Sequence, residues 1–106
     1  MRELILASGQ IAVLLRASDG ERLYGADDAP YAPVGEPFPL EFVPTPAEEL
    51  AQKIDATACV LPDADVRPED RIQMGAETYR VQTVKEERLF GAITHKVIKL
   101  VKHHAG

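Results

Sequence analysis

The most regular alternation of hydrophobic and polar positions lies in the last third of the chain. Residues 71–74 alternate polar and apolar side chains, and residues 79–83 repeat the pattern. Successive side chains of a strand point to opposite faces, so each segment is typical of a half-buried strand. Gly75-Ala76 lies between them and suits a tight turn, because glycine accepts a positive φ. With a third strand predicted over Ile93–Val101, residues 70–100 are interpreted as three consecutive antiparallel strands.

Two irregularities interrupt this pattern. Lys85–Ala92 is highly charged and contains Gly91, so it is predicted to be the connection between the second and third strands. Within the third strand the apolar residues Val97 and Ile98 are adjacent, which breaks the period of two. The break predicts either a strand covered on both faces or a β-bulge.

Upstream of this region the hydrophobic runs are shorter. Gln10–Arg16 and Ala56–Leu61 are apolar enough to predict two further strands, whereas Arg2–Ala7 is too short to distinguish helix from strand. Thr45-Pro46-Ala47-Glu48 is typical of a helix start, with Thr45 as the capping residue and proline in the first turn. The predicted helix runs to about Ile54.

The segment between Asp27 and Pro46 is irregular and rich in proline. It holds six of the eight prolines of the chain, and residues 17–50 carry eight acidic side chains against one basic. Proline lacks an amide donor and is disfavoured inside a sheet, so we predict a long acidic loop over residues 26–46. Its aromatic residues Tyr31, Phe38 and Phe42 argue against full disorder.

These elements predict a single domain over residues 1–106. The fold class is mainly β, a small antiparallel β-barrel or sandwich of five or six short strands with one short helix and the long loop. A chain of 106 residues with 45% hydrophobic side chains can bury one small core. No membrane-spanning run or signal peptide is visible, and a single cysteine excludes an internal disulfide.

The charge of the chain is unevenly distributed. The net charge is −5, yet residues 85–106 carry five basic against two acidic side chains. An acidic body argues against a general nucleic-acid-binding protein, which normally shows a basic surface. The basic end still allows a local contact with an acidic partner.

Candidate chemistry is sparse. His95 lies in a predicted strand, and His103-His104 at the chain end are adjacent and therefore poorly placed to chelate a metal. Cys59 has apolar neighbours, which predict an inert buried thiol. The acidic residues between Pro62 and Asp70 do not match a calcium-loop pattern. We therefore expect a structural or interaction protein without catalytic residues, metal or cofactor.

One part of the sequence resembles a known family. Val60–Val84, with the apolar and basic ending Val97–Leu100, is similar to head-completion proteins of tailed bacteriophages. These are the small head-closure or head–tail joining proteins of the neck. The features that carry the resemblance are Asp70-Arg71-Ile72, Gly75 and Tyr79-Arg80-Val81. They are short motifs and cover roughly the C-terminal half of the chain.

The resemblance implies a β-barrel that assembles into a homo-oligomeric ring. Such a ring lies between the portal-bound connector and the tail and helps to retain packaged DNA. The implied partners are further copies of the chain, the connector or adaptor protein, and a tail-terminator or other tail protein. DNA would pass through without specific binding, and no membrane is involved. The implied location is the virion neck, and the host cytoplasm before assembly.

Two hypotheses assign residues to that role. The acidic loop, with Asp27, Asp28, Glu36 and Glu41, lines a DNA channel and repels the phosphate backbone. Alternatively the loop orders on a neighbouring subunit, with Tyr31, Phe38 and Phe42 as contacts; we prefer this second use. In addition, Lys96, Lys99 and Lys102 are predicted to meet acidic residues of a partner or of the next subunit.

The main alternative is a small β-barrel adaptor or nucleic-acid-binding module outside the virion. It requires basic and aromatic side chains on one exposed face. Only Tyr79, Phe90 and the C-terminal lysines supply such residues, and the acidic total makes this reading the weaker one.

Overall fold

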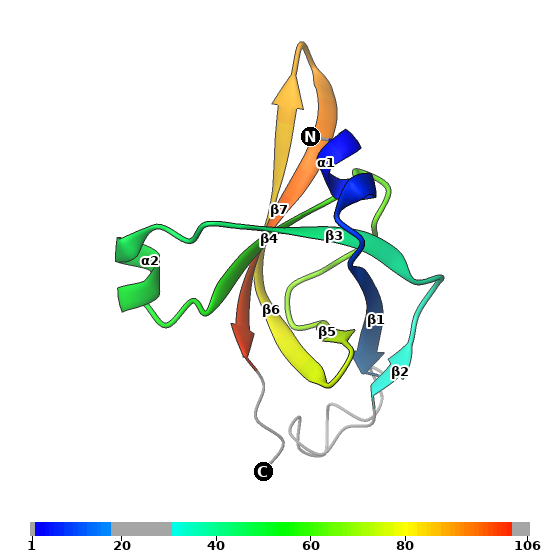
Figure 1. The fold of residues 1–106 in the computed structure, drawn as a ribbon, viewed down its shortest axis with the longest axis vertical. Coiled ribbons are helices and arrows are strands. Elements are labelled where there is room, and N and C mark those ends of the chain that lie inside the picture. The colour runs from blue at the N-terminus through cyan, green and yellow to red at the C-terminus, as the bar shows by residue number, and fades with distance from the viewer. Residues whose placement is uncertain (1, 18–30, 103–106) are drawn as a thin grey trace.

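A computed structural model describes residues 2–17 and 31–102 as a β-barrel with two short helices (Figure 1). The elements in chain order are α1 (Arg2–Ala7), β1 (Ile11–Ala17), β2 (Tyr31–Pro33), β3 (Phe38–Val43), α2 (Ala47–Ala51), β4 (Ala56–Val60), β5 (Arg71–Met74), β6 (Glu77–Leu89) and β7 (Ala92–Lys102). The predicted strands at Gln10–Arg16 and Ala56–Leu61 and the three C-terminal strands are confirmed. Arg2–Ala7, which the sequence left open, is a helix.

Six strands close the antiparallel barrel in the order β1-β3-β4-β7-β6-β5, and β5 pairs back onto β1. The seventh strand, β2, pairs with β1 at Leu15–Ala17, whereas β3 pairs with β1 only at Ile11 and Ala12. Residues 34–37, between β2 and β3, belong to no strand. The junction between β1 and β3 therefore has the shortest strand pairing in the barrel wall.

The core fills the inside of the barrel with side chains from every wall strand. Its buried members are Ala12, Leu14, Leu40, Ala58, Val60, Val66, Ile72, Val81, Ile98 and Leu100. In β7 the alternation holds at Ile98 and Leu100, and the irregularities of the β6–β7 pair lie elsewhere, at Gln82 on β6 and at Thr94 on β7. The β6–β7 register shifts between Val81 and Thr83 and again between Glu87 and Arg88, which indicates β-bulges.

The predicted long loop over residues 26–46 is wrong where it contains strands β2 and β3. Residues 38–43 form barrel strand β3, which pairs with β4, and Leu40 within it is fully buried. The prolines argued against strands here, but two of them lie in strands at positions where the pairing is short. Pro33 is the last residue of β2, and Pro39 belongs to the two-residue contact between β3 and β1. Residues 26–30 lie outside the described residues.

Helix α2 differs from its prediction at both ends. Pro46 occupies the N-cap position and no side chain caps the helix; the Thr45 hydroxyl instead lies 3.0 Å from the Thr57 hydroxyl on β4. The helix ends at Ala51, and Ile54 is buried beyond it while Leu50 is 54% exposed. A tertiary hydrogen bond thus replaces the expected local capping box.

Candidate interaction surface

Strands β6 and β7 extend beyond the barrel as a two-stranded ribbon (Figure 1). The pairing of β4 with β7 ends at Val60 and Lys96, and β5 pairs with β6 only over Glu77–Arg80. The predicted connection over Lys85–Ala92 is therefore wrong, because β6 continues to Leu89 and β7 begins at Ala92. Residues 86–95 pair with β6 or β7 alone among the described strands, and we call them the ribbon.

The ribbon ends in a two-residue turn at Phe90-Gly91. Both residues have positive φ, 53° at Phe90 and 82° at Gly91, as a type I′ turn requires. Glycine, asparagine and aspartate are the usual residues at such positions, and a bulky aromatic residue there is an outlier. Phe90 is 99% exposed and Leu89 is 60% exposed. The turn therefore exposes an apolar tip, Leu89 and Phe90, to solvent at the end of the two-stranded ribbon.

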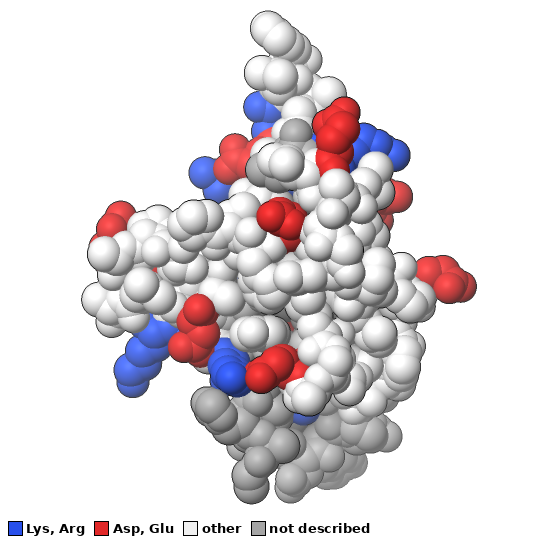
Figure 2. All heavy atoms as spheres, viewed as in Figure 1, with Lys and Arg blue, Asp and Glu red and all other residues white. Residues whose placement is uncertain are grey.

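Charged side chains surround the base of this tip. Lys85 and Glu87 lie 3.3 Å apart, and Arg88 and Glu86 lie 3.8 Å apart. Arg88 also donates a long hydrogen bond of 3.4 Å to the Gly91 carbonyl. In Figure 2 the end of the ribbon is free of charged groups, and groups of both signs lie just below it. An apolar centre with a charged rim is the usual composition of a protein-binding surface.

A cavity of about 470 Å³ opens at the junction between β1 and β3, beneath residues 34–37. We call it the seam cavity. Its apolar walls include Leu14, Val34, Phe38 and Leu61, and acidic side chains lining it are Glu36, Asp63 and Asp65. The floor comes from the segment after β4, so the cavity combines residues that are far apart in the sequence.

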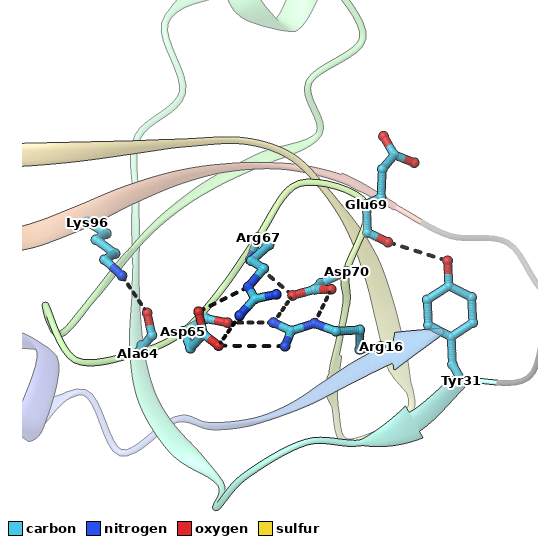
Figure 3. A network of polar contacts seen from close by, with 8 residues as sticks. All are labelled: Arg16, Tyr31, Ala64, Asp65, Arg67, Glu69, Asp70 and Lys96. Carbon is cyan, nitrogen blue, oxygen red and sulfur yellow. Dashed lines mark hydrogen bonds and ion pairs between the residues drawn. The ribbon is translucent and has the colours of Figure 1, made fainter. Parts of the chain in front are cut away.

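A cluster of guanidinium and carboxylate groups holds that segment against β1 (Figure 3). Arg16 donates to both carboxylate oxygens of Asp70, at 2.9 and 2.8 Å, and to the Asp65 carbonyl at 2.7 Å. The Arg67 amide donates to Asp70 at 3.0 Å, and the Arg67 side chain pairs with Asp65. Asp70 is only 1% exposed, so this bidentate pair fixes the segment that forms one side of the seam cavity.

The same contacts shift two ionisation equilibria. The hydrogen bond from Arg67 lowers the pKa of Asp65 from its usual 3.8, with smaller effects from the charges of Arg67 and Arg16. The hydrogen bond to Asp70 raises the pKa of Arg16 above its usual value, although burial opposes the shift. Both shifts favour the charged forms of Asp65 and Arg16.

The predicted aromatic contacts are used within the molecule. The Arg71 guanidinium lies 3.9 Å from the centre of the Tyr31 ring, and the Tyr31 hydroxyl donates to the Glu69 carbonyl at 3.4 Å. Phe38 and Phe42 are half-buried against the core, and the rings of Phe42 and Tyr79 lie 6.0 Å apart. Docking of Tyr31, Phe38 and Phe42 on a partner stays a prediction.

The three predicted lysine contacts each have a partner within the chain. Lys96 donates to the Ala64 carbonyl at 2.8 Å, Lys99 lies 2.6 Å from the Glu49 carboxylate, and Lys102 lies 2.9 Å from that of Glu77. Their spacing of three on a strand places Lys99 on the face opposite to Lys96 and Lys102. Replacing all three with glutamate would therefore also disturb folding, and their partner contact stays a prediction.

The predicted acidic residues are divided between several places. Glu36 is exposed in the segment between β2 and β3, and Glu41 is half-exposed on β3. Asp27 and Asp28 lie outside the described residues. The described part of the predicted channel lining is thus two separate carboxylates and not one continuous acidic surface, and a DNA-facing role stays a prediction.

Other candidate chemistry lies apart from this surface. Cys59 is buried on β4, and its burial raises the pKa of the thiol, as the sequence predicted for an inert cysteine. Within residues 2–17 and 31–102, no group of three or more His, Cys, Asp or Glu side chains is arranged to hold a metal ion. Neither described helix is long and apolar enough to span a membrane.

Two features were missed at the level of sequence. The charged run Lys85–Arg88 has no apolar face, so it gave no period-two signal for the ribbon. Phe-Gly between two strands is a turn signal in retrospect, although phenylalanine is unusual there. The Arg16–Asp70 pair joins residues 54 positions apart, and no local pattern indicates it.

The chain was also compared with known proteins. No model of a protein family matches it, and no curated protein was found as a relative.

Proposed function

We propose that this chain is a structural virion assembly protein, a head-closure or head–tail joining component that forms part of a neck ring. In this role it would lie between the connector and the tail and help to retain packaged DNA. The observation that carries the proposal is the ribbon, which holds a 99% exposed phenylalanine at the end of a β-barrel. The resemblance of Val60–Val84 and Val97–Leu100 to head-completion proteins supplies the biological setting.

The ribbon suits attachment for a physical reason. A large aromatic side chain in water gains about 1.5–3 kcal/mol when a partner buries it, and aromatic residues dominate the binding energy of protein interfaces. The barrel is rigid because its strands close on themselves, so the ribbon is presented in a defined direction. The expected partners are further copies of the chain, the connector or adaptor, and a tail protein.

The charges suit a component that DNA passes without adhering. The net charge is −5, and Lys96, Lys99 and Lys102 are already bound within the chain. On the face seen in Figure 2 the acidic and basic groups are scattered and form no continuous basic surface. Such a surface favours passage of a polyanion over its capture.

Complementation tests this function. Particles produced without the chain are expected to accumulate as unjoined heads that lose packaged DNA and as separate tails, which electron microscopy distinguishes. Supplying the wild-type chain should restore joined particles, whereas Phe90→Ser should not. Leu50→Ser provides a matched control, because it removes an exposed apolar side chain from α2 and leaves the ribbon intact. Joined, infectious particles formed in the absence of the chain would contradict the proposal.

A further inference from the structure

Within residues 2–17 and 31–102, the structure has an apolar tip that is not buried and an apolar cavity that is not filled. Leu89 and Phe90 are 60% and 99% exposed, and the seam cavity has about 470 Å³. A cavity of about 150 Å³ already accommodates a benzene ring, so this volume is sufficient for both side chains. We propose that the tip of one copy inserts into the seam cavity of a second copy. This inference rests on the ring assembly proposed above and assigns its contact.

The charges around the two surfaces are complementary. Glu36 and Asp63 at the cavity are exposed carboxylates, and Arg88 is the basic residue nearest to the tip. The intramolecular contacts of Arg88, 3.4 Å to a carbonyl and 3.8 Å to Glu86, are long enough to be exchanged for a better partner. Insertion of the tip would therefore bring a guanidinium to an acidic rim.

The positions of the two surfaces exclude insertion within one molecule. The ribbon extends along the longest axis of the molecule, and its tip lies at one end (Figure 1). The seam cavity lies on the flank of the barrel, where β1 meets β2 and β3. The two surfaces differ, so a contact that uses one tip and one cavity from each pair of copies is head-to-tail, and its repetition yields a closed ring or an open filament.

This geometry makes mixing of two variants a direct test. Phe90→Ser removes the tip and keeps the cavity, whereas Glu36→Arg with Asp63→Arg reverses the rim and keeps the tip. All three residues are exposed, so both proteins should fold, which thermal unfolding checks. Sedimentation velocity would be measured for the wild type, each variant alone and an equimolar mixture, at concentrations up to about 1 mM.

Self-association of the wild type is expected to rise with concentration. Each variant alone should associate about ten- to a hundredfold more weakly, as removal of a central aromatic or reversal of rim charges predicts. The mixture should form a dimer and no larger species, since only one intact tip and one intact cavity can meet. Leu50→Ser, a surface change on α2, should associate like the wild type.

Three results would overturn the proposal: a wild-type chain that stays monomeric throughout, a Phe90→Ser variant that associates normally, or a mixture without dimers. The sedimentation assay uses the purified chain alone, so it tests the tip-to-cavity contact independently of the proposed role in the neck. If mixing fails while complementation of particles succeeds, the tip-to-cavity contact is refuted and the neck role stands.

Discussion

At the scale of single residues, Asp70 is the side chain whose contacts most clearly determine how two distant segments of the chain pack together. Its carboxylate is 1% exposed and accepts hydrogen bonds from the Arg16 side chain and the Arg67 amide. A buried carboxylate is tolerated only when its lone pairs are satisfied, and here two guanidinium donors and one amide do so. The pair therefore holds the segment after β4 against β1, where it forms one side of the seam cavity.

Asp70→Asn is expected to destabilise the fold by about 2–4 kcal/mol, because the amide keeps the shape but leaves Arg16 without its buried, bidentate counter-charge. Chemical denaturation at pH 7 measures the loss. Asp63→Asn is the matched control: it removes the same charge from an exposed position and should change stability by less than about 0.5 kcal/mol. Equal effects of the two changes would show that the Arg16–Asp70 pair does not hold the segment.

The lowered pKa of Asp65 predicts a dependence of stability on pH. A carboxyl with a lower pKa in the folded state stabilises the fold when it is ionised. Its contribution is fully present above the usual pKa of 3.8 and is lost as the pH falls through the lowered value. Because its side chain is 61% exposed, the contribution is at most about 1 kcal/mol.

Asp65→Asn should therefore reduce stability at pH 7 and approach the wild type below pH 3.8, as measured by urea denaturation across this range. A difference that persists undiminished in acid would assign the effect to packing and not to charge.

At the scale of elements, the ribbon and the barrel are distinct structural units. The barrel strands pair with neighbours on both sides, whereas residues 86–95 lie beyond the pairing of β4 and β5 and contribute no buried side chain. Helix α2, by contrast, is tied to the barrel through the Glu49–Lys99 pair at 2.6 Å. The ribbon is therefore expected to contribute little to the stability of the barrel.

Replacing residues 87–95 with Asn-Gly tests this division, since Glu86 and Lys96 face each other and suit a two-residue turn. The shortened chain should unfold cooperatively, with a free energy within about 1 kcal/mol of the wild type, because it retains every buried core side chain. It should fail to restore joined particles. A shortened chain that does not fold would show that the ribbon is needed for the barrel.

At the scale of the whole molecule, the sequence predicted strands better than it predicted their closure. Period two identified β5, β6, β7 and the apolar runs of β1 and β4. Closure depends on β1 meeting β5, and no local pattern specifies a contact over that separation. The prolines concealed β3, and the ribbon was concealed because a solvated strand has no hydrophobic alternation. The tip and the cavity were missed because, like the closure of the barrel, they arise from the tertiary arrangement and not from a local sequence pattern.

Closure of the barrel predicts strong protection of Cys59. Its side chain is 2% exposed on β4, and burial raises the pKa of the thiol, which lowers the reactive thiolate fraction in the folded state. Labelling by a thiol reagent at pH 8 should be at least about a thousandfold slower than in the unfolded chain. Rapid labelling under native conditions would indicate that β4 opens without global unfolding.

The central claim is that this chain is an attachment protein that makes its contact through the ribbon. The most direct measurement is cosedimentation of the purified chain with heads that lack it and carry the connector. The account predicts that the wild type and Leu50→Ser bind in several copies per head, whereas Phe90→Ser remains in the supernatant. Heads that bind Phe90→Ser as well as the wild type, or that bind neither, would contradict it.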